Sequence, residues 1–290
     1  MTSITELARP KVNLTLRVLG RRADGYHELE SLVAFACDIA DAVTLTPRAG
    51  QPHVVTNGPF AGSIAGANLI DVTLARIQAA APTLRLGDVA LYKRLPVAAG
   101  IGGGSADAAA VLRAVRTLNG DQAPTIDWLA LAASLGADVP VCVASSARLM
   151  RGIGERLEPL TGFPELAAVL VNPWVAVPPD KTAQVFRALK APPLRDLDRA
   201  TPSGFCSRAD LLAHMRAIGN DLLAPAIGVV PAIRDVLEAL EADPQCEVAQ
   251  LSGGGPTCFG IYPDMTAAHA ASAALRAKQP RWWIVATRLA

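Results

Sequence analysis

The N-terminal part of the chain alternates between apolar and polar positions. This period of two predicts a half-buried strand, whose apolar face is formed by Val12, Leu14, Leu16 and Val18. The Asp24-Gly25 pair that follows suits a tight turn between strands, and residues 29–46 continue as strand. The pattern therefore predicts that the chain opens with a β-hairpin rather than with a strand followed by a helix.

Helical periodicity appears further along the chain. Residues 68–81 and 105–118 repeat apolar positions at helical spacing, which places those positions on one stripe of a helix. The second segment begins at Ser105, a residue type that favours the N-cap, and stops at Asn119-Gly120. The same reasoning predicts helices over 126–135, 208–218, 231–242 and 266–278, and strands over 247–251, 257–262 and 281–289.

The order of these elements indicates a fold class and a domain boundary. Near the C-terminus, strand, loop, strand, helix and strand follow one another, which is typical of an α+β domain. Residues 173–193 are rich in proline and are either a linker or an irregular loop across a cleft. We place the boundary near residue 160, which divides the chain into domains 1–160 and 161–290.

Composition narrows the classes of function. Hydrophobic residues make up 51% of the 290 residues and charged residues 18%, a balance that supplies a core and argues against disorder. The net charge of +1 gives no bulk attraction to nucleic acid or to an anionic membrane. The N-terminus lacks the apolar segment of a signal peptide, so the expected location is the cytoplasm.

Neither the cysteines nor the histidines have the spacing of a metal site. The five cysteines are widely spaced without a CxxC pair, and the four histidines are scattered. We therefore expect no zinc site, no disulfide framework and no metal ion held by protein side chains.

The strongest local motif is a glycine-rich loop that leads into the helix predicted from Ser105. Glycine admits backbone conformations closed to other residues and lets a ligand approach the amides, while a helix start adds unpaired N–H groups. The loop is a candidate phosphate cradle, with a flexible loop before a helix as the alternative. It matches neither GxxxxGK[ST] nor GxGxxG. Its residues are Pro96, Val97, Ala98, Ala99, Gly100, Ile101, Gly102, Gly103, Gly104, Ser105 and Ala106.

Three polar positions on two other segments are candidates for chemistry. Asp138 stands in the otherwise apolar segment 135–143, where a buried carboxylate needs a cation or hydrogen bonds. It either orients a hydroxyl group or only ends a helix or forms a turn. Lys11 and Asn13 share one face of the first strand, and that face either lines a cleft or is simply solvated.

Two further motifs have both a functional and a structural interpretation. Tyr26 and His27 follow the Asp24-Gly25 turn and either bind a ring and an amide edge or pack on the sheet. A second glycine cluster, residues 251–257, lies between two predicted strands. It either brings the backbone close to the first loop or to phosphate, or it is a plain tight turn.

Three of these motifs stand in the order seen in a known superfamily. A lysine strand comes first, then the loop Pro-x3-Gly-Ile-Gly-Gly-Gly-Ser, and late in the chain Ser-Gly-Gly-Gly-Pro-Thr. This order resembles the galactokinase, homoserine, mevalonate and phosphomevalonate kinases, the GHMP kinases. The stretches RPKVNLTLRVLGRRADGYHELESL and GADVPVCV are similar to the branch that phosphorylates a diphosphocytidyl polyol. The likeness runs from about residue 8 to residue 265.

The resemblance implies a fold and a reaction. GHMP kinases have a two-domain α+β fold, with an N-terminal domain like ribosomal protein S5, a ferredoxin-like C-terminal domain and the active site in the cleft between them. The implied activity is ATP-dependent phosphorylation of the polyol's 2-hydroxyl group in non-mevalonate isoprenoid precursor biosynthesis. Mg²⁺ would be held mainly by the ATP phosphates. The alternatives are a homoserine or mevalonate type of GHMP kinase, or a nucleotide-binding module without catalysis.

The resemblance also implies the partners of the protein. The expected partner is the small cytidine-diphosphate-linked substrate, with no nucleic acid and no membrane, and the protein is expected to be a monomer or a weak homodimer.

Matching motifs imply roles for particular residues. Lys11 and Asp138 resemble the catalytic pair, and residues 96–106 resemble the loop that binds the ATP phosphates. The residues that resemble the substrate contacts are Asn13, Tyr26, His27, Thr182 and Phe186, with Trp174 as an alternative stacking partner.

Two positions depart from the family pattern. Ala106 stands where a second serine is usual, and Gly254 stands where a serine or threonine is common. Both departures remove a side-chain hydroxyl group and leave the backbone donors in place.

Overall fold

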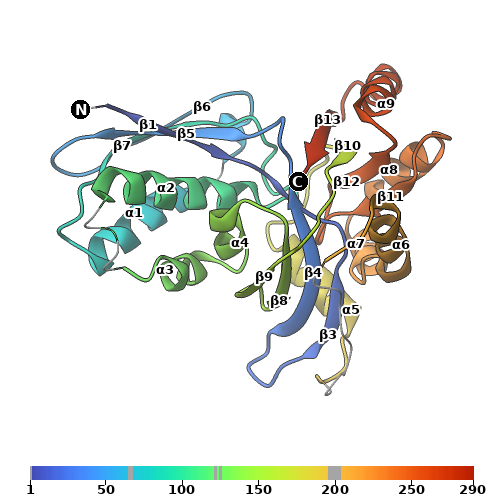
Figure 1. The fold of residues 1–290 in the computed structure, drawn as a ribbon, viewed down its shortest axis with the longest axis horizontal. Helices are drawn as coiled ribbons and strands as arrows, with labels where there is room; N and C mark the ends of the chain where they lie inside the picture. The colour runs from blue at the N-terminus through green and yellow to red at the C-terminus, as the bar shows by residue number, and fades with distance from the viewer. Residues whose placement is uncertain (1, 65–67, 121–122, 124–125, 195–203) are drawn as a thin grey trace. The chain divides into compact units, whose positions relative to one another are not determined.

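The computed structural model describes residues 2–64, 68–120, 123, 126–194 and 204–290 (Figure 1). The chain divides into two compact units that interleave along the sequence. The first unit contains residues 1–11, 39–97 and 102–145, and the second contains residues 12–38, 98–101 and 146–290. The domain boundary expected near residue 160 stays a prediction.

A mixed sheet and a layer of helices build the first unit. The sheet has the order β1-β5-β7-β6, in which β6 runs parallel to β7 and the other neighbours are antiparallel. The helices lie together on one side of this sheet (Figure 1). The elements are β1 (Ile4–Ala8), β5 (Asp41–Pro47), β6 (Val54–Asn57), the 3-10 helix η1 (Ala61–Ser63), α1 (Leu69–Ala80), β7 (Gly87–Tyr92), α2 (Gly103–Asn119), α3 (Trp128–Leu135) and α4 (Val139–Ala144).

Helix α2 buries the apolar stripe that its sequence predicts, but it begins earlier than expected. Ala108, Val111, Leu112 and Val115 are all buried. The N-cap is Gly102, with φ of 64° and ψ of 25°, so the prediction of Ser105 as N-cap is wrong. The left-handed glycine turns the chain directly into the helix, which places Ser105 in the first turn.

Two sheets build the second unit. The first has the order β2-β4-β8-β9, with β3 paired to β4, and the second has the order β11-β12-β10-β13. The strands are β2 (Lys11–Asn13), β3 (Arg17–Arg21), β4 (His27–Phe35), β8 (Arg148–Gly152), β9 (Arg156–Pro159), β10 (Leu166–Asn172), β11 (Val248–Leu251), β12 (Cys258–Tyr262) and β13 (Trp283–Leu289). The helices are α5 (Lys181–Leu189), α6 (Arg208–Ile218), α7 (Leu223–Val229), α8 (Ala232–Glu241) and α9 (Met265–Lys278).

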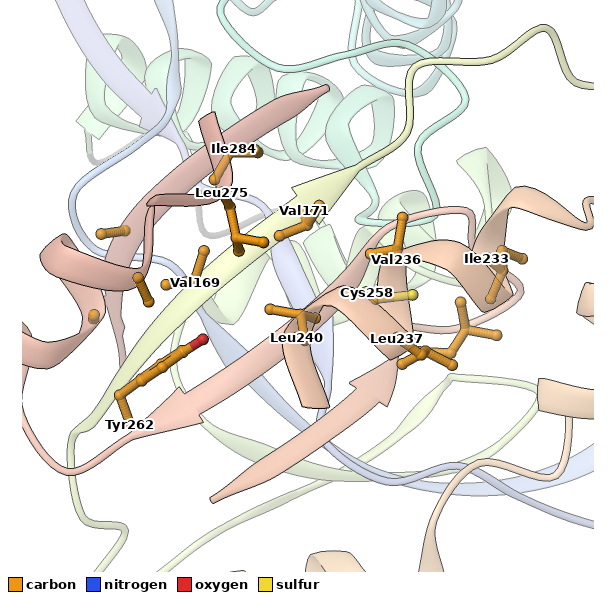
Figure 2. Close-up of a cluster of buried hydrophobic side chains, with 14 of the residues drawn as sticks. Val169, Val171, Ile233, Val236, Leu237, Leu240, Cys258, Tyr262, Leu275 and Ile284 are labelled. Carbon is orange, nitrogen blue, oxygen red and sulfur yellow. The ribbon is translucent and has the colours of Figure 1, made fainter. Parts of the chain in front are cut away.

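The core of the second unit forms where helices cover the β11-β12-β10-β13 sheet. Figure 2 shows the α8 side chains gathered with Val169 and Val171 of β10. The buried α8 positions follow the i, i+3, i+4, i+7 spacing of a core-facing helix: Ile233, Val236, Leu237 and Leu240. This packing fixes β11 and β12, the strands on either side of the second glycine cluster.

Helix positions are predicted better than strand boundaries. Each of the six predicted helices is present, with shifts of at most a few residues at the ends. The single strand predicted over 29–46 is wrong, because β4 ends at Phe35, β5 begins at Asp41, and the two strands lie in different sheets. Between them the carboxylate of Asp38 accepts hydrogen bonds from the backbone and side chain of Arg288, which holds the chain out of both ladders.

The strand predicted from Val12 to Val18 is also interrupted. The structure has β2 up to Asn13 and β3 from Arg17, and between them the amide of Leu16 donates to the carbonyl of Gly219. Helices α4 and α5 lie in segments that the pattern does not assign to helices. The first has a proline in its first turn, and the second lies within the proline-rich stretch 173–193. In the part of the chain that the structure describes, no helix is long and apolar enough to cross a membrane.

Candidate active site

The first unit brings Lys11 and Asp138 together. Lys11 follows β1 after a short Arg9-Pro10 connection, and Asp138 is the N-cap residue of α4. The Lys11 Nζ lies 3.0 Å from Asp138 Oδ1, and the two side chains are 6% and 35% exposed. Asp138 makes no side-chain cap to its own helix, so its carboxylate faces the lysine rather than closing a turn. The arrangement provides a partly exposed carboxylate held next to a nearly buried ammonium group.

Burial decides between the two interpretations of the first strand. Lys11 and Asn13 are both buried, so a solvated face is the wrong interpretation. The Asn13 side-chain amide donates to Ser31 Oγ at 2.8 Å, and its backbone amide donates to Ser252 Oγ at 3.1 Å. Asn13 therefore links strand β2 to the second glycine cluster within the second unit.

The glycine-rich loop runs directly against Lys11. A Cβ atom added at Gly102 would lie 2.8 Å from Lys11 Cγ, and φ there is +64°. Both the space and the backbone conformation therefore require glycine at this position. Because Gly102 is also the N-cap of α2, the start of that helix lies beside the Lys11–Asp138 pair.

The start of α2 has the properties of an anion site. The amide of Ala106 makes the first intrahelical bond, to the Gly102 carbonyl at 2.8 Å, which leaves the amides before it outside the helical ladder. A Cβ at Gly104 would meet nothing within 4 Å, so the outer side of this turn is open. Left-handed φ values occur at Ala98, Gly100 and Gly102. Free amides at a helix N-terminus can bind phosphate.

The second glycine cluster contacts residues 98–101 of the loop, which belong with it to the second unit. A Cβ at Gly100 would collide with the carbonyl oxygen of Gly255, and the Thr257 amide donates to the Ala99 carbonyl at 3.1 Å. The cluster therefore brings the two backbones close together, rather than forming only a turn. A buried lysine that the sequence analysis did not identify, Lys181, donates to the Gly255 carbonyl as well.

A buried charge cluster lies under the loop and was not predicted. The Lys93 ammonium donates to Asp41 Oδ2 at 2.5 Å and to Asp107 Oδ2 at 2.6 Å. The other Asp41 oxygen accepts from the amides of Arg94 and Leu95. These contacts join the segment before the loop to Asp107 in the second turn of α2. In the sequence Lys93 stands next to Arg94 and Asp107 follows the glycine loop, but nothing marks Asp41. With Ser105 as N-cap, Asp107 would lie in the first turn, which the earlier helix start shows to be wrong.

Burial and charge oppose each other in this cluster. Burial raises the pKa of Asp107, while the positive charge of Lys93 works against that shift. Burial lowers the pKa of Lys93, but the two carboxylates outweigh it and the pKa is raised overall. The ammonium therefore stays charged and is the group that keeps both acids in place.

Two residues expected on the base side contact each other in the second unit. The rings of His27, the first residue of β4, and Phe186, on α5, are stacked with centroids 4.8 Å apart and an interplanar angle of 28°. Burial, and then the charge of Arg21, lowers the pKa of His27, so its imidazole is neutral at pH 7. A neutral imidazole can both donate and accept a hydrogen bond.

The other expected substrate contacts are exposed. Tyr26 and Trp174 are 61% and 60% exposed, and the Tyr26 amide donates to Asp24 Oδ1 in the predicted turn. Thr182 is exposed one helical turn before Phe186, so both lie on one face of α5. Ala106, where the family usually has a serine, is buried in α2 and offers nothing to a phosphate group.

Comparisons with known proteins define the class. The family models for the GHMP kinases N terminal domain and the GHMP kinases C terminal match residues 68–146 and 206–281. The crystal structure of a 4-(cytidine 5'-diphospho)-2C-methyl-D-erythritol kinase is 35% identical, with a TM-score of 0.77 and 99% of each chain covered. A homoserine kinase from Cytophaga hutchinsonii, 15% identical with a TM-score of 0.66 over 99% of this chain and 95% of that chain, shares the fold. The protein is a GHMP kinase.

Relatives at higher identity define the branch. The 4-diphosphocytidyl-2-C-methyl-D-erythritol kinases of Methylorubrum extorquens and Methylobacterium radiotolerans are 46% and 48% identical over 296 and 295 residues, which cover 100% of this chain and of each relative. The chain belongs to the 4-diphosphocytidyl-2-C-methyl-D-erythritol kinase family. The predicted superfamily, its two-domain α+β fold class and the enzyme class are thereby confirmed.

Proposed function

We propose that the protein transfers the γ-phosphoryl group of ATP to the 2-hydroxyl group of 4-diphosphocytidyl-2-C-methyl-D-erythritol, a step toward isoprenoid precursors. Relatives that match the whole chain are named as kinases of this substrate. The observation that carries the proposal is the Lys11–Asp138 pair, 3.0 Å apart, with Gly102 of the phosphate loop against the lysine stem. A module that only bound nucleotide would have no use for this pair.

The pair supplies the two effects that phosphoryl transfer needs from a protein. Asp138 accepts or orients the proton of the attacking hydroxyl group. Lys11 keeps Asp138 ionised and offsets negative charge on the transferred phosphoryl group. Because both side chains are already in contact, little reorganisation is needed before the reaction.

The loop is proposed to hold the ATP phosphates through backbone amides. The amides at the start of α2 lie outside the helical ladder, and the turn at Gly104 is open on its outer side. Among the described residues no group of three or more histidine, cysteine or acidic side chains could hold a metal ion. We propose that a Mg²⁺ ion held mainly by the ATP phosphates would offset their charge.

The base side is proposed to recognise cytosine by stacking and by its hydrogen-bonding edge. His27 and Phe186 are at stacking distance with centroids 4.8 Å apart, and a flat base between them requires the two rings to separate. The neutral His27 imidazole would form a hydrogen bond with the edge of the cytosine ring. The exposed Tyr26 and Thr182 lie on the hairpin and on the helix that present this pair, and Asn13 would act from strand β2.

We also propose where the enzyme is located and how it assembles. The first proposal rests on the free cysteines and the second on the fact that one chain supplies all the site residues. All five cysteines are free thiols, which is typical of a reducing compartment, so we place the enzyme in the cytoplasm. One chain supplies the pair, the loop and the base-side rings, so a monomer or a weak homodimer suffices.

The test is ADP release by the purified protein with ATP and Mg²⁺ in the presence of three separate alcohols. We expect turnover with the diphosphocytidyl polyol and none above background with homoserine or mevalonate. Turnover with homoserine or mevalonate alone would assign the protein to another GHMP activity. ATP binding without phosphoryl transfer to any of the alcohols would favour a non-catalytic module.

A further inference from the structure

The two residues of the Lys11–Asp138 pair come from distant parts of the chain. Lys11 follows strand β1, which ends at Ala8, and Asp138 precedes helix α4, which begins at Val139. A single ion pair does not fix two backbones, because a lysine side chain is long and rotatable. The backbones of both segments must therefore be positioned by other contacts in the first unit.

Arg113 contacts both segments with one guanidinium group. From the middle of α2, its Nη2 donates to the Leu7 carbonyl of β1 at 2.8 Å, and its Nη1 donates to the Cys142 carbonyl of α4 at 2.9 Å. Leu7 lies four residues before Lys11, and Cys142 lies one helical turn after Asp138. The same side chain therefore spans the two backbones that bring the pair together.

The acceptors suit an arginine. Cys142 lies in the last turn of α4, where carbonyls lack helical partners and favour a cation. Leu7 is on β1, an edge strand of its sheet, and edge strands leave carbonyl groups unpaired. The Arg113 Nε donates to Glu6 Oε2 at 2.9 Å, which balances its charge. A planar fork can donate in three directions at once, whereas an ammonium group on a flexible stem does not hold this geometry.

We propose that Arg113 is a positioning residue that sets the distance between Lys11 and Asp138, an inference that rests on the proposed function of that pair. The hydrogen bonds of Arg113 go to Glu6, Leu7 and Cys142, which flank the pair along the chain. It acts by tying β1 and α4 to α2, the helix whose N-terminus begins at the phosphate loop. Loss of the Arg113 hydrogen bonds would change the geometry of Lys11 and Asp138. The loop would stay in place, because Lys93 separately joins the segment before it to Asp107 of α2.

The test compares Arg113→Gln with Arg116→Gln. Arg116 is exposed one turn further along α2 and serves as the matched control. We expect kcat of Arg113→Gln to fall by up to ~100-fold, the effect of a small misplacement of catalytic groups. The KM for ATP should stay within about twofold of the wild-type value, and Arg116→Gln should behave as wild type. Arg113→Lys should not restore kcat, since a single ammonium cannot replace the fork.

A double-mutant cycle separates positioning from a general loss of structure. If Arg113 acts through the pair, its substitution should have little further effect in an Asp138→Asn background. Equal losses of kcat in both backgrounds would overturn the proposal, as would a wild-type kcat for Arg113→Gln.

A second measurement keeps this inference separate from the substrate assignment. A crystal structure of Arg113→Gln should show the Lys11 Nζ–Asp138 Oδ1 distance lengthened from 3.0 Å, and an unchanged distance would overturn the inference whichever alcohol is the substrate. Inactivity of the wild-type enzyme toward the diphosphocytidyl polyol would instead contradict only the proposed function. The cycle would then be measured with the alcohol that is phosphorylated.

Discussion

The two units prepare for their ligands in opposite ways. In the first unit Lys11 already contacts both Asp138 and Gly102, and the buried cluster around Lys93 lies next to Gly103 at the start of α2. In the second unit His27 and Phe186 contact each other, and Tyr26 is exposed. On the proposed roles, the reacting side is therefore preorganised, whereas the base side has to rearrange to admit a base. Substitutions on the reacting side should lower kcat, and substitutions on the base side should raise the KM for the polyol substrate.

The largest effect is expected from Asp138→Asn, which keeps the size of the side chain and removes its charge. Turnover should fall by ~10²- to 10⁴-fold, the range for loss of a general base. Nucleotide affinity should be nearly unchanged, since the loop amides remain. Steady-state kinetics and calorimetric titration with ATP measure the two quantities. A fully active variant would contradict the role given to the pair.

The next effect concerns stability. Lys93→Met leaves the buried carboxylates of Asp41 and Asp107 without their cation, and breaking such a buried cluster costs about 3–5 kcal/mol. Urea unfolding should show this loss in the free energy of unfolding. Arg94→Met is the control, because Arg94 is exposed, and its unfolding midpoint should not move. Equal stability of the two variants would mean that the cluster does not hold the loop.

Two glycine substitutions test the contact between the loop and Lys11. Gly102→Ala introduces a Cβ 2.8 Å from Lys11 Cγ at a φ of +64°, so either the loop or the lysine must move. We expect kcat to fall by ~10-fold or more, as for other misplaced catalytic groups. Gly104→Ala adds the same atom where no protein atom lies within 4 Å, so Lys11 should stay in place and kcat near the wild-type value, with any loss falling on the KM for ATP. Similar kinetics for both variants would show that the loop and Lys11 are not coupled.

On the base side, Phe186→Ala should raise the KM for the polyol substrate by about tenfold and leave the KM for ATP unchanged. Stacking of a base on an aromatic ring contributes ~1–3 kcal/mol, and the lower end applies because one ring remains. Tyr26→Ala tests the other aromatic candidate, and Trp174→Ala tests the alternative stacking partner in the same assay. His27→Ala should also weaken discrimination between the cytidine and uridine substrates. A KM that moves only in the Trp174 variant would transfer the stacking role to that residue.

The smallest effect is a shift in one titration. Burial holds the pKa of His27 below its usual 6.5, so the proton leaves this imidazole at lower pH in the folded protein than in the unfolded chain. The stability from this residue is present above pH 6.5 and is lost as the pH falls from there through the folded pKa. An NMR titration should show the lowered pKa, and Phe186→Ala should move it back toward 6.5. An unchanged pKa in that variant would show that the ring does not bury His27.

The sequence predicts local features of the site well and long-range ones poorly. The helix after the glycine loop, the turn before Tyr26 and the second glycine cluster follow from residue types within a few positions of each other. The superfamily order of motifs also points to Lys11 and Asp138, although spacing alone leaves a structural interpretation open for each. Their contact is tertiary, and no periodicity encodes it.

The missed features share one physical cause. Asp41 begins β5, Lys93 follows β7 and Asp107 lies on α2. A buried ion cluster has no signature in the sequence until the fold brings its members together. Similarly, the break between β4 and β5 depends on Arg288 holding Asp38, a contact from the far end of the chain. Alternation of apolar residues continues across the break, so the pattern alone predicts one strand.

The ring contact between His27 and Phe186, 4.8 Å apart, makes the base side self-closed. A base that enters between the rings must first separate them, and it then contacts a ring on each of its faces. On the proposed roles, a small acyclic alcohol such as homoserine or mevalonate has no flat face to replace the ring–ring contact, so it gains nothing from opening the pair. An inhibitor directed at this side needs a flat ring for the same reason.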